Sequence, residues 1–396
     1  MNYPRIFLKP GKEQSLRRFH PWVFSGAIKR IEGSPLDGDV VEICDTNGIF
    51  LALGHYQNGS IAVRIFSFLQ VEVDRNFWLK KIQNALSVRQ KLGLFPNPKT
   101  NIFRLVHGEG DGLPGLIVDI YGATAVIQAH STGMFLIRPL LAEIIVEVLN
   151  GSITSIYDKS SGTIPGKNDI QTKDSYLLGP PINEILLENG NKFLVSWEEG
   201  QKTGFFVDQR ENRLLLEKYC KNANVLNTFC YTGGFSVYAL RGGAKKVISV
   251  DSSQKAIDLT NSNIKINFGE TPNHQSFCTD VFEFLKNSKE EFDVIVLDPP
   301  AFAKSTHALK NALQAYKRLN AAAFRKLKSG GILFTFSCSQ VVNREQFRNA
   351  VFSGSIIAEK QVRILHQLTQ PADHPVNIYH PEGEYLKGLV LQVDNF

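Results

Sequence analysis

The sequence predicts an α/β protein in three parts: a small N-terminal β-barrel (residues 1–72), a central α+β domain (73–198) and a C-terminal, mostly parallel sheet (199–396). Two observations lead to this prediction. Before residue 72, short apolar runs are separated only by Gly, Asp and Asn turns. After residue 224, apolar β-branched runs alternate with helical patterns, and such alternation requires parallel pairing of the strands.

Composition excludes several classes of protein. An apolar share of 43% and a charged share of 21% are ordinary for a globular chain. No stretch of about 18 apolar residues predicts a membrane span, and the charged N-terminus lacks the apolar core of a secretion signal. The odd number of cysteines and their lack of metal-ligand spacing favour a reducing compartment, so we expect a cytoplasmic protein without a metal site.

Positive charge is concentrated at the N-terminus. The chain has 44 basic and 38 acidic residues, a net charge of +6. Residues 1–30 hold seven basic residues against Glu13 alone, an excess of six that equals the net charge of the whole chain. This placement fits a polyanionic partner, and a solvated face without a partner explains it equally well.

The most distinctive part of the predicted barrel is RRFHPWVFSGAI, residues 17–28. Arg17 and Arg18 could hold phosphate groups, while His20 and Trp22 could stack on unpaired bases. We expect Phe24 to lie in the barrel core instead. For Trp22 the core and a base-stacking role both remain open.

The central domain contains no pattern that requires catalysis. A helix is expected over Phe77–Leu92, and Asn189-Gly190 between apolar runs predicts a hairpin. His107 lies with Glu109 and Asp111 in a glycine-rich stretch that could suggest a metal or acid–base site. Turn chemistry explains each of these residues more simply.

The stretch from Val225 to Asp251 reads as strand, glycine turn, helix, strand and acid. A turn through Gly233 would let backbone approach a ligand, and an acid at the next strand end could accept hydrogen bonds from a ribose diol. Tyr231 occupies the place of the first glycine of a dinucleotide motif, which disfavours NAD and leaves S-adenosylmethionine. An ordinary α/β turn after a strand is the alternative.

Two further segments would complete this nucleoside site. Asp280 follows a predicted strand and could meet the exocyclic amine of adenine, with Val281 beside the ring. A helix expected from Asp208, its N-cap, to Tyr219 carries Gln209 and Arg210 in its first turn, near the methionine end of the nucleoside. The alternative is that these two side chains are simply exposed on the helix.

A rigid loop, Asp298-Pro-Pro-Ala-Phe302, follows a buried strand. Ligands of open α/β sheets bind at the carboxyl ends of the strands. The Asp298 carboxyl could hydrogen-bond the polar edge of a flipped base while the Phe302 ring stacks on it. An acid that only makes a turn is the alternative.

Cys338, in the Ser-Cys-Ser at the end of the next strand, could act as a nucleophile. Cytosine C5 is too weakly nucleophilic to take a methyl group unaided, and a thiolate added to C6 would turn the ring into an enamine. Asp298 could then take up charge at the N3/N4 edge. A cysteine that merely fills space in the core is an equal alternative.

In the remaining part of the chain, a helix is predicted over His307–Lys328, and Gly330-Gly331 is expected to end it. A further strand of the sheet is expected directly after these glycines. Two last strands, Val362–Leu368 and Leu386–Val393, are joined by irregular chain without a helix. They predict one antiparallel edge.

Taken together, these motifs resemble the PUA-domain family of class I S-adenosylmethionine-dependent ribosomal-RNA methyltransferases, the family of the 23S cytosine-C5 enzyme. The motifs, which span nearly the whole chain in order, are HPWVFSGAI, HGEGDGLPGLIVD, GFFVDQRENR, LNTFCYTGGFSV, VDSS, LDPPAF and TFSCS. The resemblance implies a PUA-like RNA-binding barrel, a Rossmann-like methyltransferase sheet, an RNA substrate and Cys338 as the nucleophile. It also implies a cofactor site formed by Gln209, Arg210, Asn227, Phe229, Tyr231, Gly233, Asp251, Ser252, Asp280 and Val281.

We therefore expect methylation of cytosine C5 in RNA, with 23S ribosomal RNA as the expected substrate, through a covalent cysteine adduct. The Asp-Pro-Pro-aromatic motif also resembles that of enzymes that methylate base nitrogens, so methylation of guanine or adenine is the alternative enzyme. A catalytically silent RNA-binding module is the alternative from another class. Either a monomer or a homodimer is compatible with the sequence.

Overall fold

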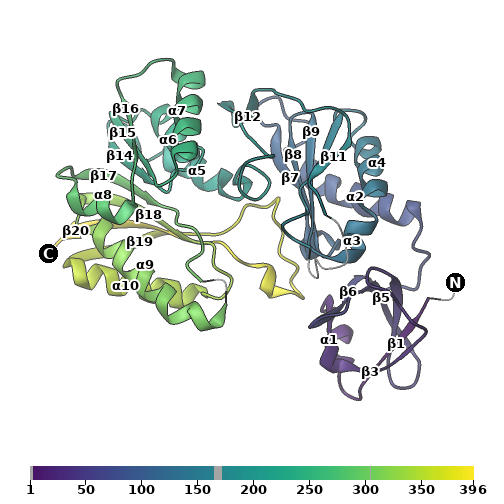
Figure 1. The fold of residues 1–396 in the computed structure, drawn as a ribbon. Coiled ribbons are helices and arrows are strands. Elements are labelled where there is room, and N and C mark those ends of the chain that lie inside the picture. Colours follow the sequence, from purple (N-terminus) through teal and green to yellow (C-terminus); the bar gives the residue numbers. More distant parts are fainter. Residues whose placement is uncertain (1–2, 165–171, 304) are drawn as a thin grey trace. The chain divides into compact units, whose positions relative to one another are not determined.

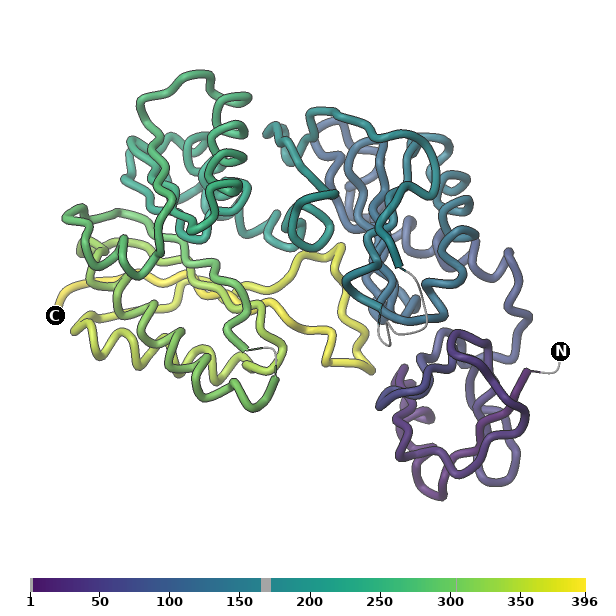
Figure 2. Tube along the Cα trace, in the orientation of Figure 1, coloured from purple at the N-terminus to yellow at the C-terminus, as the bar shows by residue number. Residues whose placement is uncertain are grey.

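The computed structural model describes residues 3–164, 172–303 and 305–396, and the chain forms two compact units (Figure 1). The first unit contains Met1–Leu186, Ser196–Val207 and Ala372–Gly383, and the second contains Leu187–Val195, Asp208–Pro371 and Glu384–Phe396. The Cα trace in Figure 2, coloured by residue number, shows where the chain passes from one unit to the other. Within the described ranges, no helix is long and apolar enough to cross a membrane.

The N-terminal part of the first unit is a six-stranded sheet with the order β2-β6-β5-β4-β1-β3. Its elements are β1 Arg5–Leu8, α1 Gln14–Arg17, β2 Trp22–Phe24, η1 Ser25–Ala27, β3 Ile28–Glu32, β4 Val40–Cys44, β5 Phe50–Tyr56 and β6 Ile61–Ser67. Alternate apolar residues fill the core: Ile6, Leu8, Leu16, Val23, Val41, Ile43, Ala52, Val63 and Ile65. Phe24 is 50% exposed, so the prediction that it lies in the core is wrong.

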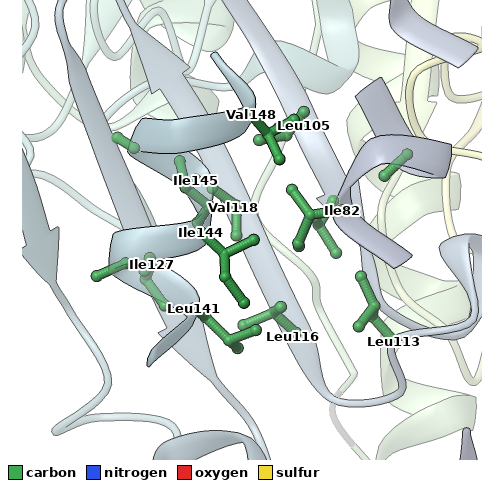
Figure 3. Packing of buried hydrophobic residues seen from close by; sticks show 14 of the residues in the cluster. Ile82, Leu105, Leu113, Leu116, Val118, Ile127, Leu141, Ile144, Ile145 and Val148 are labelled. Carbon is green, nitrogen blue, oxygen red and sulfur yellow. The ribbon is translucent and has the colours of Figure 1, made fainter. Parts of the chain in front are cut away.

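The central part is a five-stranded sheet with the order β11-β10-β9-β8-β7, packed against helices. Its elements are α2 Arg75–Lys91, β7 Ile102–His107, η2 Gly108–Asp111, β8 Leu116–Tyr121, β9 Thr124–Ala129, α3 Thr132–Leu136, α4 Arg138–Val148, β10 Ser155–Asp158 and β11 Ser175–Leu178. Figure 3 shows Ile82 of α2 and Ile144 of α4 meeting Val118 of β8, all three fully buried. The apolar stripe of each helix therefore covers the sheet.

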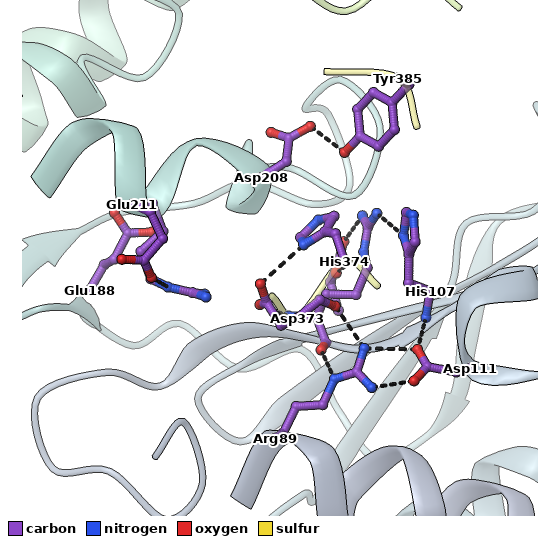
Figure 4. A network of polar contacts seen from close by, with 12 residues as sticks. Arg89, His107, Asp111, Glu188, Asp208, Glu211, Asp373, His374 and Tyr385 are labelled. Atoms are coloured by element: carbon purple, nitrogen blue, oxygen red, sulfur yellow. Dashed lines mark hydrogen bonds and ion pairs between the residues drawn. The ribbon is translucent and has the colours of Figure 1, made fainter. Parts of the chain in front are cut away.

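Arg89 of α2 connects this sheet to residues 372–383 of the same unit (Figure 4). Its fully buried guanidinium pairs with both Asp111 oxygens, at 2.5 and 2.8 Å, and donates to the Asp373 carbonyl at 2.7 Å. Asp373 in turn accepts the Arg104 backbone N–H at 3.0 Å. Asp111 is thus occupied by a structural ion pair, in agreement with a turn rather than a catalytic centre at residues 107–111.

We expect Arg89→Ala to lower the free energy of unfolding by about 3–5 kcal/mol, because Asp111 would remain buried without its partner. Urea denaturation of the full chain would measure this change. Arg75→Ala is the matched control on the same helix, since the pair between Arg75 of α2 and Glu147 of α4 is exposed and should contribute less than about 1 kcal/mol. Equal effects of the two substitutions would contradict the assignment.

The second unit is built on a seven-stranded sheet with the order β16-β15-β14-β17-β18-β20-β19. The strands are β14 Asn224–Thr228, β15 Lys246–Asp251, β16 His274–Cys278, β17 Phe292–Leu297, β18 Leu327–Ser337, β19 Lys360–Leu368 and β20 Lys387–Asn395. The first five are parallel to one another, and β20 runs antiparallel to β18 and β19. The predicted antiparallel edge is confirmed.

Helices cover both faces of this sheet. They are α5 Arg210–Glu217, α6 Gly234–Arg241, α7 Gln254–Phe268, α8 Val281–Asn287, α9 Leu309–Phe324 and α10 Arg344–Ala358, with η3 Val207–Gln209, η4 Thr306–Ala308 and η5 Pro381–Gly383 as short turns. Leu226 packs in one cluster with α8, α9 and α10, while its neighbour Val225 packs in another with α5 and α6. Strand residues alternate between the two faces, and both faces are buried.

Three local expectations meet different outcomes. The hairpin at Asn189-Gly190 is confirmed, with β12 Leu186–Glu188 and β13 Asn191–Phe193 on either side and positive φ at both turn residues. The helix predicted to run to Lys328 ends at Phe324 instead. Gly330-Gly331 lie in an irregular stretch of β18, where the register with β17 shifts, so these glycines mark a bulge rather than a helix end.

Candidate active site

The glycine turn after β14 has an unusual backbone. Phe229 and Tyr231 have φ of 54° and 48°, and Gly233 has φ of 75°. A Cβ at Gly233 would lie 2.7 Å from Thr260 Cγ2, so the turn has no room for a side chain there. The Thr260 hydroxyl donates to the Tyr231 carbonyl at 3.0 Å and holds the turn against α7. Such strain persists only where the surroundings enforce it, and it often marks a ligand site.

Asp251 fixes the turn from the end of β15. Its Oδ2 accepts the Tyr231 backbone N–H at 3.0 Å, and its Oδ1 accepts the Ser253 N–H at 3.0 Å. The half-buried carboxylate therefore keeps lone pairs in a fixed direction, as recognition of a diol requires. Ser252, next to it, is exposed.

Asn227 lies beneath the turn, 1% exposed. Its Nδ2 donates to Ser236 Oγ at 2.8 Å, and that hydroxyl is 2.7 Å from Ser249 Oγ. Within the described residues its buried Oδ1 has no hydrogen-bond partner. The side chain thus joins β14, α6 and β15 behind the turn.

Asp280 is exposed and serves as the N-cap of α8. Its Oδ1 accepts the Glu283 N–H at 3.0 Å, and Val281 beside it is buried. The preceding Thr279 N–H donates to the Asp251 carbonyl at 2.9 Å. The ends of β15 and β16 are therefore directly connected, and they place Asp280 next to the Asp251 loop.

Gln209 and Arg210 are each 2% exposed, so the alternative of two exposed helix residues is wrong. Gln209 Oε1 accepts from Asn212 Nδ2 at 2.6 Å. Asp208 is not the predicted N-cap. Gln209 takes that position without a capping side-chain bond, and Asp208 Oδ2 accepts the Tyr385 hydroxyl at 2.7 Å (Figure 4).

The two strand-end motifs meet. Leu297 of β17 pairs with Thr335 of β18, so the loops that follow these parallel strands leave the sheet side by side. Cys338 Sγ lies 4.0 Å from the Pro299 carbonyl, directly after Asp298. Both Cys338 and Asp298 are half-buried, whereas Cys230 is buried and burial raises the pKa of its thiol to about 12. Of these two thiols, Cys338 has the environment of a reactive one.

Phe302 is half-buried and lies against Tyr316, with 4.7 Å between the ring centroids. Burial, together with the smaller effects of the Cys338 and Asp298 charges, raises the pKa of Tyr316 to about 12. The Phe302 ring is therefore supported from α9 beside the Asp298 loop.

Sequence reasoning missed Lys387, which pairs with Ser337 across β18 and β20. Lys387 is 4% exposed, and its ammonium donates to the Ser339 and Tyr385 carbonyls, at 2.5 and 2.7 Å. Burial lowers the pKa of Lys387 to about 8, and the charge of Cys338 opposes that shift. The attraction is mutual, so the ammonium favours the Cys338 thiolate. The pairing of Lys387 with Ser337 becomes visible only when β18 and β20 are placed side by side as antiparallel strands.

The N-terminal candidates lie on the surface of the first unit. Arg17 forms an ion pair with Asp45 at 3.3 Å, and Arg18 is exposed. Trp22 is half-buried and donates from Nε1 to Glu109 at 2.8 Å, while His20 lies next to it. A pocket of about 300 Å³ is lined by Lys12, Ser15, Leu16, Trp22, Val23, Phe24, Gly26 and Ala27.

The order of the strands in the second unit, the glycine turn after β14 and the acids at the strand ends together define a class of protein. This class is the S-adenosylmethionine-dependent methyltransferases, here with an additional N-terminal domain. The family described as S-adenosylmethionine-dependent methyltransferase matches residues 169–351, and the PUA-like domain family matches residues 6–68. The predicted fold class and cofactor are confirmed. The domain boundaries at 72 and 198 stay predictions.

Comparison with curated relatives gives the particular family. The chain is 41% identical over 395 residues to ribosomal RNA large subunit methyltransferase I of Aeromonas hydrophila, covering 98% of each protein. It is 38% identical over 400 residues to the protein of that name from Escherichia coli strain SMS-3-5, covering 98% of this chain and 99% of the relative. The chain belongs to the ribosomal RNA large subunit methyltransferase I family.

Solved structures agree in fold. A Streptococcus mutans protein described as a SAM-dependent methyltransferase aligns with a TM-score of 0.82 at 24% identity, covering 98% of this chain and 99% of that one. A methyltransferase solved with SAH has a TM-score of 0.84 at 23% identity, with the same coverage.

Proposed function

We propose that this protein methylates C5 of a cytosine in large-subunit ribosomal RNA through a covalent adduct with Cys338. The observation that carries the proposal is the position of the Cys338 thiol, 4.0 Å from the carbonyl that follows Asp298. A nucleophile and an acid thus stand together at the carboxyl ends of adjacent strands, where such sheets bind ligands. The RNA substrate rests on the names of the relatives and on the PUA-like domain.

The chemistry divides one difficult step into easier ones. The Cys338 thiolate would add to C6, and the ring electrons would move toward the N3/N4 edge, where the Asp298 carboxyl would stabilise them by a hydrogen bond. Bound S-adenosylmethionine would supply the methyl group that C5 of the enamine takes up, and S-adenosylhomocysteine would leave. A base removes the C5 proton, the C5–C6 double bond reforms, and the thiolate is expelled.

The cofactor would lie along the ends of β14, β15 and β16. Asp251 would accept hydrogen bonds from the ribose, and Asp280 from the adenine amine, with Val281 beneath the ring. Gln209 and Arg210 would stand near the methionine end. Asn227 is buried and bonded to Ser236, which supports a role in holding the turn rather than direct contact. Phe229, Tyr231 and Gly233 would offer backbone, and Ser252 would lie at the rim.

RNA would bind the N-terminal domain at its basic, aromatic surface. Arg18 and Lys12 supply charge, and the exposed Phe24 beside a pocket of about 300 Å³ supplies a stacking surface. Arg17, His20 and Trp22 have protein partners, so they would shape this surface as well as touch RNA. A ribosomal RNA substrate would place the protein in the cytoplasm.

Lys387 gives the proposal a pH test. Below the Lys387 pKa of about 8, the ammonium is charged and stabilises the neighbouring Cys338 thiolate by electrostatic attraction. We expect Lys387→Met to move the rise of the methylation rate to higher pH by about one unit, a roughly tenfold loss on the acid side. Lys387→Arg keeps the charge and should retain the profile. An unchanged profile in the methionine variant would exclude this role.

The experiment that tests the function uses ribosomal RNA from a strain lacking the related enzyme. The full chain is incubated with labelled S-adenosylmethionine and naked RNA or assembled subunits, and the modified nucleoside is identified by mass spectrometry. We expect 5-methylcytidine. Methylguanosine or methyladenosine would establish nitrogen methylation instead, and the absence of product on either substrate would favour a silent RNA-binding module.

A further inference from the structure

Three side chains with metal-ligating atoms meet in the first unit: His20, before β2, and His380 and Glu382, within residues 372–383. Their donor atoms all lie within 4.8 Å of one another. Glu382 approaches both rings, with Oε1 3.7 Å from His20 Nε2 and Oε2 3.8 Å from His380 Nε2. These distances exceed those of good hydrogen bonds, so the cluster is close without being satisfied.

His380 is the distinguishing member. It is 3% exposed, and among the described residues neither of its ring nitrogens has a hydrogen-bond partner. The ring is held by Trp22, whose centroid lies 4.3 Å away. The His380 backbone N–H donates to the Asn377 carbonyl at 2.8 Å, which fixes the turn that carries it. Buried polar atoms are nearly always paired, so this positioned imidazole has two nitrogens open to a partner from outside the chain.

We propose that His20, His380 and Glu382 bind one divalent transition-metal ion, best matched by Zn²⁺. Imidazole nitrogen and carboxylate oxygen are common zinc ligands at about 2.0–2.2 Å, which places tetrahedral donors roughly 3.4 Å apart. The distances of 3.7 and 3.8 Å need only small shifts, and Glu382, whose side chain is 54% exposed, can make them. A water would complete the tetrahedron.

The His20 Nδ1 atom lies close to the Trp22 backbone, 3.2 Å from the Trp22 N–H, which can donate to it, and 3.4 Å from the Trp22 carbonyl. Metal binding at Nε2 would select the tautomer that carries hydrogen on Nδ1 and donates to that carbonyl, in place of the bond from the Trp22 N–H. A histidine that ligates a metal through one ring nitrogen usually donates a hydrogen bond from the other nitrogen to a carbonyl, carboxylate or water. The bound ion would join the N-terminal sheet to residues 372–383. Because His20 and His380 lie at opposite ends of the chain, ligand spacing in the sequence gives no sign of the site.

The test is metal binding by the full chain after chelator treatment. Equilibrium dialysis with Zn²⁺ is expected to show one bound equivalent, and Mg²⁺ should not compete. His380→Ala should weaken binding by at least about 100-fold, since loss of even an outer partner costs about 10–100-fold. Glu382→Gln, at an exposed position, gives a second variant that leaves the fold intact. The exposed His307→Ala is the matched control and should bind as the unaltered chain does.

The Co²⁺ spectrum separates this site from the free cysteines. Nitrogen and oxygen ligands give visible d–d bands without the near-ultraviolet charge transfer of a thiolate. Charge-transfer bands, binding unchanged in both variants, or less than one equivalent of Zn²⁺ would overturn the proposal.

Discussion

Replacing Cys338 with alanine is expected to abolish formation of 5-methylcytidine, with a loss of at least about three orders of magnitude in kcat. Without the thiol no enamine forms, and the remaining positioning of substrates supplies only a small part of the acceleration. S-adenosylmethionine should bind the variant with unchanged affinity, because the Cys338 thiol follows β18 rather than the glycine turn. Single-turnover assays with mass spectrometry would measure the loss.

Cys278→Ala is the control for this result, since Cys278 is exposed at the end of β16 and should be dispensable. A covalent complex between the unaltered protein and RNA containing 5-fluorocytosine would be expected, and it should be missing for Cys338→Ala. Methylation that survives in Cys338→Ala would remove the covalent mechanism and favour direct transfer to a base nitrogen.

Replacing Gly233 with alanine is expected to weaken S-adenosylmethionine binding by roughly 10–100-fold. The residue has φ of 75°, where an added Cβ costs about 1–2 kcal/mol. That Cβ would also lie 2.7 Å from Thr260 Cγ2, so α7 or the turn must shift. Both changes act on the backbone that faces the cofactor. Isothermal titration calorimetry would measure the affinity.

Gly269 supplies the matched control. It has φ of 68° after α7, and a Cβ there would have no heavy atom within 4 Å. Gly269→Ala therefore also introduces strain at a positive φ, although with ψ of −152° rather than the 17° of Gly233, and it does so without the clash. It should lower the thermal midpoint while leaving cofactor affinity unchanged. Equal affinities of the two variants would show that the turn after β14 tolerates the shift.

The parallel sheet could be predicted because its strands are buried on both faces and read as continuous β-branched runs, as Val294 to Leu297 do. The glycine turn could be predicted because its requirement is local. Gly330-Gly331 misled the prediction, since glycines after a helical pattern fit a helix end as well as a bulge. Helix α10 was missed, although Asn343 and Gln346 form a capping box that signals its start.

The site residues that escaped prediction are those brought together by distant segments. Lys387 reaches the Cys338 loop only through the pairing of β18 and β20. Phe24 lies in an apolar run typical of a strand core, but a three-residue edge strand leaves its ring half exposed. No local pattern records either fact, because both depend on which strands become neighbours.

The anchoring of residues 372–383 by Arg89 has a consequence for synthesis on the ribosome. The Asp373 carbonyl that completes the Arg89 network is translated nearly last, after almost all of the second unit. An emerging chain that ends at Val207 therefore holds a buried arginine without one of its acceptors. The first unit therefore cannot be completed until residues 372–383 have been synthesised, and a stop codon before Asp373 would damage the N-terminal half of the protein.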